Sequence, residues 1–151
     1  DTAGSASSNV LDDYEEGTWT GVVKDHDEAA AMTMDTGGED RTTGAYTKIG
    51  NIVFISGFLQ SSSLGSVSGN ISLFGLPFTA NSQNNYQTSI YMMGGGEGYA
   101  ITAGHSVGGY VNPSTTSIIL TVTDATSGVT HMQESEWTAD GGVMVMGHYS
   151  V

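Results

Sequence analysis

The 151-residue sequence contains no cysteine, only two prolines and only three basic residues. The absence of cysteine excludes thiol catalysis, disulfide bonds and zinc sites with cysteine ligands. The sequence also has no run of about 18 apolar residues that could span a bilayer, and no basic and then apolar amino-terminal segment of the signal-peptide kind. We therefore expect no insertion into a membrane.

Basic residues are so scarce that 16 acidic side chains leave a formal net charge of −13. Such a charge repels phosphate backbones and anionic lipid headgroups, so nucleic acid and bare membrane are poor candidates as partners. The simplest interpretation of the acidic residues is a solvated surface. Binding of a divalent cation such as Ca²⁺ is the alternative, and no other cofactor is indicated.

Glycine is abundant, with 22 residues, whereas long amphipathic helices are missing. This composition favours short strands joined by tight turns. The clearest example is residues 44–60, GAYTKIGNIVFISGFLQ. There Gly50-Asn51 separates two runs rich in β-branched and aromatic residues, 45–49 and 52–59, which predicts a β-hairpin.

Two of the predicted strands, 52–59 and 143–151, carry apolar side chains on both faces. Alternate residues of a strand face opposite ways, so each of these strands must be covered on both sides. That is more apolar surface than one sandwich of this length easily hides, which predicts self-association. The side chains that we assign to an interface between copies or to the core are Ile52, Phe54, Phe58, Met144 and Met146.

Further strands are predicted at residues 18–24, 71–74, 88–93, 98–103 and 117–123, the last of them half solvated. Residues 25–43 lack alternation, which predicts a long exposed loop with one helical turn around 28–34. About eight short strands separated by turn signals predict an antiparallel β-sandwich. We expect a single domain at residues 11–151, preceded by a Gly/Ser-rich linker at residues 1–10 that leads from an upstream segment.

Four segments carry a resemblance to a known family: LDDYEEGTWT at 11–20, YTKIGNIVFISG at 46–57, GLPFTA at 75–80 and the closing GGVMVMGHYSV. Together they resemble the carboxy-terminal β-sandwich domain of bacteriophage tail fibres and tailspikes. The resemblance implies a jelly-roll-like homotrimer that caps an upstream fibre or shaft domain at the tail fibre tip of the virion, and that is extracellular after host lysis. In some members such domains contact glycans of the bacterial surface. Where the family has a proline after the Trp-Thr pair, this chain has Gly21, which leaves the path of that strand open.

A glycan site needs an exposed aromatic ring beside polar side chains, because the ring covers the apolar face of a pyranose while amides and carboxylates bond its hydroxyls. Two clusters have this composition: Tyr86 with Asn84 and Asn85, and Trp137 with Glu134 and Glu136. We predict carbohydrate binding at these residues. The alternative is that Tyr86 is an ordinary loop residue and that Trp137 packs over the end of the sandwich.

Hard oxygen ligands and one imidazole occur within four consecutive residues, Asp25, His26, Asp27 and Glu28. They could form part of a Ca²⁺ or transition-metal site. The spaced ligands and the turn glycine of an EF-hand loop are missing, and a solvated acidic loop is the simpler interpretation.

Two patterns associated with enzymes are interpreted as structural. Residues 104–108, GHSVG, match the G-x-S-x-G motif of serine hydrolases, but Gly109, Asn112 and Pro113 exclude the helix that must follow the serine. The acidic residues at 12–16 could supply the paired carboxylates of a glycoside hydrolase, yet nothing in the sequence builds the apolar pocket that keeps one of them protonated.

The sequence therefore predicts a non-enzymatic module that trimerises a fibre tip and contributes to recognition of a host glycan. A purely structural trimerisation module without receptor binding is the alternative. An enzyme that degrades surface polysaccharide is a more distant third possibility.

Overall fold

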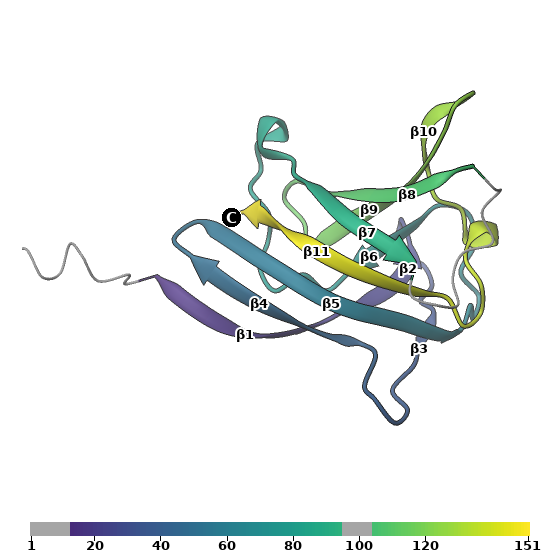
Figure 1. The fold of residues 1–151 in the computed structure, drawn as a ribbon, viewed down its shortest axis with the longest axis horizontal. Helices are drawn as coiled ribbons and strands as arrows, with labels where there is room; N and C mark the ends of the chain where they lie inside the picture. Colours follow the sequence, from purple (N-terminus) through teal and green to yellow (C-terminus); the bar gives the residue numbers. More distant parts are fainter. Residues whose placement is uncertain (1–12, 95–103) are drawn as a thin grey trace, which may run out of the picture.

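A computed structural model describes residues 13–94 and 104–151, which form an antiparallel all-β fold (Figure 1). Its strands are β1 (Tyr14–Thr20), β2 (Val22–Asp25), β3 (Thr33–Met34), β4 (Thr43–Ile49), β5 (Ile52–Ser63), β6 (Ile71–Phe74), β7 (Ser89–Gly94), β8 (Ser106–Val111), β9 (Ser117–Asp124), β10 (Gly128–His131) and β11 (Gly142–Ser150). Two single-turn 3₁₀ helices, η3 (Asn84–Tyr86) and η4 (Glu134–Glu136), lie between strands. Within the described residues, no helix has the length and apolarity needed to cross a membrane.

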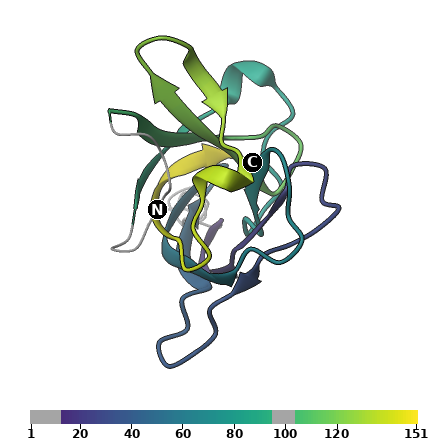
Figure 2. The ribbon, with the colours of Figure 1, turned by 90° about the vertical axis from the view of Figure 1, so that its right-hand side faces the viewer.

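The strands follow one hydrogen-bonded path, β1-β4-β5-β11-β7-β8-β9-β6-β2, while β10 pairs with β9 and β3 pairs with β5. Because a single residue joins β1 to β2, the two ends of this path are consecutive in the chain. The sheet thus curls into a nearly closed, barrel-like shape (Figure 2). The predicted all-β antiparallel class is confirmed, and the two layers are joined through β7, which pairs with β11 in one layer and with β8 in the other.

Gly21 is the residue at which the chain passes from one layer to the other. Its backbone N–H donates to the carbonyl of Thr42 at 2.8 Å, and a β-carbon at this position would lie within 2.5 Å of the Leu59 side chain. A proline would lose that hydrogen bond, and a larger residue would clash with the core. The strand predicted at 18–24 is therefore divided here, with β1 beginning earlier, at Tyr14.

The predicted hairpin is confirmed. Strands β4 and β5 pair from Ile49 with Ile52 to Gly44 with Gly57, around the two-residue turn. Gly50 has a φ of +59°, and Asn51 is not among the positive-φ residues. This is the pattern of a type II′ turn, which needs glycine at its first central position and whose twist matches that of the flanking strands.

The core lies between the two layers and includes Leu59, Leu73, Trp137 and Tyr149, each nearly inaccessible to solvent. Burying a side chain of this size stabilises the fold by roughly 1.5–3 kcal/mol. The hydroxyl of Tyr149 is also satisfied, since it donates to the carbonyl of Phe78 at 3.0 Å and accepts the N–H of the same residue at 3.2 Å. Burial raises the pKa of Tyr149 to about 12.

Strands β6, β7 and β9 confirm three further predictions, but two segments differ from expectation. No helical turn forms around 28–34, because Glu28 adopts a φ of +63° and Thr33–Met34 pairs with β5 instead. Strand β9 is not half solvated, since residues 117–122 are all buried. It is a central strand, with β8 on one side and with β6 and β10 on the other. The strand predicted at 98–103 and the linker at 1–10 lie outside the described residues.

Candidate functional site: an exposed apolar sheet face

The layer β1-β4-β5-β11-β7 packs on the core with one side and faces solvent with the other. In β5, Val53 and Ile55 point into the core, whereas Phe54 is 46% exposed. In β11, Val145 points inward and Met146 is 59% exposed. The two apolar faces predicted for these strands are thus present, but the chain covers only one of them with its own residues.

Most of the large apolar side chains that the structure exposes lie on this outward side. Nine large hydrophobic side chains are exposed in the described residues, and seven of them lie here: Tyr14, Ile49, Phe54, Tyr91, Met93, Met144 and Met146. The half-buried Ile52 and Phe58 share the same side. We call these nine residues the outer apolar face. The other two exposed large hydrophobic side chains, Tyr86 and Val129, lie apart from it. Most of the exposed large hydrophobic side chains of the described residues are therefore on one surface.

Strand register arranges the face in transverse rows, because directly paired residues of an antiparallel sheet point to the same side. One row contains Phe58, Met144 and Met93. The next contains Ser56, Met146 and Tyr91. A third crosses four strands in the order Glu16, Thr47, Phe54 and His148, and there the rings of Phe54 and His148 lie 5.7 Å apart between centroids.

Two shallow hollows lie among the residues of the outer apolar face, beside a third of about 410 Å³ whose lining includes Glu16, Thr18 and Thr47. The larger, of about 450 Å³, lies among Phe58, Tyr91, Met93, Met144 and Met146. The smaller, of about 360 Å³, is lined by residues that include Thr47, Phe54 and His148. Methionine side chains adapt to irregular surfaces, so hollows of this composition fit apolar side chains of a partner.

The outer apolar face has almost no charged side chains, although the chain has a formal net charge of −13. In its rows, Glu16 is the one acidic side chain and His148 the one that can become cationic, among the described residues. The hydroxyl of Tyr14 donates to Glu16 Oε2 at 2.7 Å, and this bond to a carboxylate raises the pKa of Tyr14.

Each of the three basic residues of the chain is paired with acids, and the Arg41 guanidinium also lies 5.8 Å from the ring centroid of Phe58, at the border of the outer apolar face. Lys24 lies 2.9 Å from Glu28, Arg41 lies 3.9 Å from Asp35 and 3.7 Å from Glu39, and Lys48 pairs with Asp13. The surface therefore offers no cluster of unpaired lysine or arginine to a polyanion.

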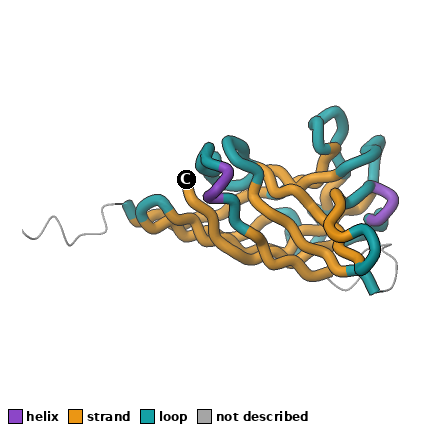
Figure 3. The backbone as a smooth tube through the Cα atoms, turned by 90° about the horizontal axis from the view of Figure 1, so that it is seen from above, coloured by secondary structure: helices purple, strands orange, loops and turns teal. Residues whose placement is uncertain are grey.

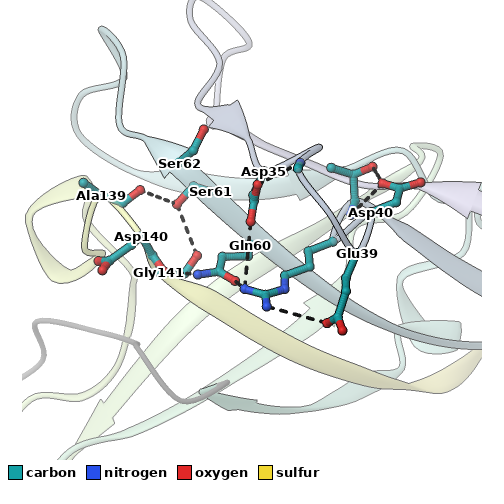
Figure 4. A network of polar contacts seen from close by, with 12 residues as sticks. Asp35, Glu39, Asp40, Gln60, Ser61, Ser62, Ala139, Asp140 and Gly141 are labelled. Carbon is teal, nitrogen blue, oxygen red and sulfur yellow. Dashed lines mark hydrogen bonds and ion pairs between the residues drawn. The ribbon is translucent and has the colours of Figure 1, made fainter.

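A polar network fixes two loops at the end of β5 that lies away from the β4–β5 turn (Figure 4). The guanidinium of Arg41 donates to Gln60 Oε1 at 2.5 Å, and Gln60 Nε2 donates to the carbonyl of Asp140 at 2.9 Å. Ser61 Oγ donates to the carbonyls of Ala139 at 3.1 Å and Gly141 at 3.2 Å. The loops at residues 35–41 and 139–141 are thus both held to one strand.

The two predicted glycan clusters lie on the two 3₁₀ helices, at opposite ends of the strands (Figure 3). They therefore do not form a single site. In η3, Tyr86 is 54% exposed and is flanked by exposed Asn84 and Asn85. This cluster keeps the exposed aromatic ring beside amide side chains that was expected of a glycan site.

The second predicted glycan cluster has no exposed aromatic ring. Trp137 is 2% exposed, belongs to the core and donates its indole N–H to Ser61 Oγ at 2.9 Å. Glu136 accepts the backbone N–H of Gln133 at 2.8 Å as part of a capping box, and Glu134 is half-buried beside it. Trp137 is therefore corrected from a candidate sugar platform to a core residue, because the short helix turns its ring inward.

The predicted cation ligands point to separate partners. Asp25 is buried and accepts the N–H of Ser68 at 2.7 Å, Asp27 accepts that of Ala29 at 3.4 Å, and Glu28 pairs with Lys24. His26 Nδ1 lies 3.0 Å from Ser72 Oγ. No group of three or more His, Asp or Glu side chains able to hold a metal ion occurs in the part of the chain that the structure describes. Ca²⁺ binding at residues 25–28 stays a prediction that this geometry does not support.

The residues of the G-x-S-x-G pattern lie in a different context from a nucleophile elbow. Ser106 begins β8, and the chain continues as a strand rather than as a helix. His105 Nε2 is 3.9 Å from Asp124 Oδ2, but this carboxylate also accepts the backbone N–H groups of Ser127 and Thr126 in the β9–β10 turn. These N–H groups lower the pKa of Asp124.

The four segments that carry the family resemblance pack on one another. Strand β1, in the first segment, pairs with β4, which contains the start of the second. The ring of Phe78, in GLPFTA, makes an edge contact with Tyr46 of YTKIGN at 5.3 Å between centroids. The backbone of Phe78 also holds the hydroxyl of Tyr149 from the closing segment. Three of the four segments thus meet around this residue, at the end of the molecule that contains the β4–β5 turn.

The fold is one that occurs in a tailspike. Its similarity to the crystal structure of Dettilon tailspike protein (gp208) has a TM-score of 0.72, covers 91% of this chain and has 19% sequence identity. The chain spans 24% of the length of that tailspike chain. No model of a known protein family matches the sequence, and no curated protein matches it. At this level of identity the similarity shows the shared fold.

Proposed function

We propose that this chain is a non-enzymatic module of a phage tail fibre or tailspike, which assembles as a homotrimer and contributes to recognition of a host-surface glycan. The observation that carries the proposal is the outer apolar face, on which seven exposed large hydrophobic side chains gather. The occurrence of this fold in a tailspike supports a location at the tail of a virion.

A second copy of this chain is the partner that best fits the outer apolar face. The face is apolar and nearly free of charge, whereas the chain as a whole carries −13. Copies that meet through this face bring their apolar side chains together and keep most of their acidic side chains apart. A head-to-tail contact that closes after three copies gives a ring rather than an open filament.

The two ends of such an assembly would have different roles. The N–H of Gly50 donates to the carbonyl of Asp13 at 3.0 Å, and that of Val151 donates to the carbonyl of Asn51 at 2.9 Å, so the start of β1 and the end of β11 lie at one end. An upstream shaft that enters at β1 would meet this end. The loops held by Arg41 and Gln60 would then face the host.

Tyr86, with Asn84 and Asn85, is the glycan candidate that the geometry leaves, because its ring is exposed. It lies near the end that contains Ser150, whose carbonyl accepts the N–H of Asn81 at 2.9 Å. A glycan bound there would contact the flank of the fibre rather than its far tip.

The mass of the purified chain in solution tests the assembly. Light scattering should give about three times the 15.6 kDa of one chain. A monomer at micromolar concentration would contradict the proposal. A trimer that binds no glycan on arrays or whole host cells would favour the purely structural module, whereas release of reducing sugar from host polysaccharide would favour an enzyme.

Glycan binding is tested separately, with Tyr86→Ala as the variant and Val129→Ala as the matched control. Both residues are exposed and both lie outside the outer apolar face. Loss of binding in the first variant alone supports a role of the Tyr86 ring, because stacking on a sugar needs that ring.

A further inference from the structure

Among the described residues, Glu16 and His148 are the acid and the imidazole that share a transverse row with Phe54 of the outer apolar face. We propose that Glu16 of one copy pairs with His148 of the next copy, and that this contact fixes the register of the trimer. The inference rests on the proposed function, because it concerns the same face.

The two residues cannot meet within one chain. They lie in the same transverse row, but Thr47 of β4 and Phe54 of β5 stand between them. Three interstrand spacings separate their backbones by about 14 Å. The hydroxyl of Tyr14 is the hydrogen-bond partner of Glu16, and the aromatic ring of Phe54 is the neighbour of His148.

Burial of the face between copies leaves Glu16 in need of a cation. The hydroxyl of Tyr14 is its hydrogen-bond partner, but a carboxylate that is buried without a counter-charge is strongly destabilising. Lys24, Arg41 and Lys48 are already paired with acids, and Arg41, which lies over the ring of Phe58, is beside a different row of the face from Glu16. His148 of another copy is the group on the face that can take this role.

The row also places the two side chains where neighbouring copies would bring them together. The strands of this layer run along the long axis of the molecule (Figure 1). In a ring of copies around an axis parallel to the strands, the residues of one row lie at the same position along that axis in every copy. Glu16 lies on β1, at one edge of the layer, and His148 lies on β11, toward the opposite edge. The β1 edge of one copy therefore contacts the β11 and β7 side of the next. Glu16 and His148 then lie at the same position along the axis.

This contact gives the assembly a defined pH dependence. The neighbours of His148 on the face are Phe54 from β5, Met146 and Ser150 on its own strand and Tyr91 diagonally across on β7. Among the described residues in the rows of the face, Glu16 of the next copy is therefore the acid that can face it. A carboxylate attracts a protonated imidazole more strongly than a neutral one, and protonation of imidazole is favoured as the pH falls. The trimer should therefore become tighter as the pH falls from 8 to 6, and weaker again when the carboxylate is protonated.

The test measures, by analytical ultracentrifugation, the protein concentration at which half of the chains are trimeric, at pH 8, 7 and 6. In the wild type this concentration should fall several-fold from pH 8 to pH 6. Glu16→Gln and His148→Gln should each remove the pH dependence and raise the midpoint about tenfold or more, because each leaves a buried polar group without its charged partner. Glu28→Gln and His131→Gln, which change an acid beside Lys24 and a histidine on β10, are the matched controls off the face and should behave as the wild type.

Exchanging the acid and the histidine between the two positions distinguishes a direct contact of Glu16 with His148 from a general effect of charge on the face. Glu16→His and His148→Glu should each weaken the trimer, and the double variant should recover most of the loss. A double variant no better than the single ones, or a wild-type trimer that weakens steadily from pH 8 to pH 6, would overturn the pair while leaving the trimer in place. A wild-type monomer at every pH would overturn the proposed function together with the pair.

Discussion

The indole ring of Trp19 lies directly against the backbone of Gly44. Its N–H donates to the carbonyl of Ala45 at 3.2 Å and to that of Ser56 at 3.3 Å, so β1 is held to both β4 and β5. A β-carbon at residue 44 would overlap the indole nitrogen and the Ser56 carbonyl. The position of Trp19 thus depends on the absence of a side chain at Gly44.

Replacement of Gly44 by alanine should destabilise the fold by about 1–3 kcal/mol, the usual cost of overpacking a core. Gly108→Ala is the control, because a β-carbon there would meet nothing nearer than Thr121 Oγ1 at 3.5 Å. Urea unfolding followed by tryptophan fluorescence measures both variants. Equal unfolding midpoints for the two would show that the contact between Trp19 and Gly44 is not as tight as described.

Tyr149 should make the fold sensitive to alkali. Burial raises its pKa to about 12, above the value of about 10 for an unfolded tyrosine. The folded state therefore holds the proton more tightly, and this stabilisation is complete below pH 10 and is lost as the pH rises through 12. The loss amounts to about 2–3 kcal/mol. Chemical denaturation at pH 9, 10 and 11 should show the decline in the wild type and a flatter profile in Tyr149→Phe, and parallel profiles would contradict this role.

Gln60 should control the mobility of two loops at once. It is buried, and it joins Arg41 to the carbonyl of Asp140. Gln60→Ala should cost about 1–3 kcal/mol, because it leaves a backbone carbonyl and part of a guanidinium unsatisfied. Hydrogen–deuterium exchange should become faster in residues 35–41 and 139–141 together. The exposed Gln87→Ala is the control, and faster exchange in only one of the loops would mean that Gln60 does not couple them.

The sequence was sufficient for the strands that obey simple alternation. The hairpin around Gly50 and the strand at 71–74 follow from local turn chemistry and side-chain patterning. Gly21 could not be interpreted in this way, because its role depends on the distant Leu59. The buried face of β9 was missed for the same reason, since it is covered by neighbouring strands that alternation within one segment does not reveal.

Part of the candidate site was also accessible from the sequence. Two apolar faces on 52–59 and 143–151 already indicated surplus apolar surface, and the structure leaves Phe54, Met144 and Met146 exposed. Tyr91 and Met93 were not assigned to the same face, because only the register between β7 and β11 brings them there. Trp137 was misjudged because a short polar helix surrounds it in sequence while its ring lies in the core.

The central claim is that copies of this chain meet through the outer apolar face, and a pair of matched aspartate variants tests it most directly. Met146 lies on that face and is 59% exposed, whereas Val129 is 65% exposed on β10. Neither change should disturb the monomer fold, because both side chains face solvent, but a buried aspartate at 146 would be strongly unfavourable between copies. Light scattering should give the mass of one chain for Met146→Asp and of three chains for Val129→Asp. A trimeric Met146→Asp variant, or loss of the trimer in Val129→Asp alone, would contradict the account.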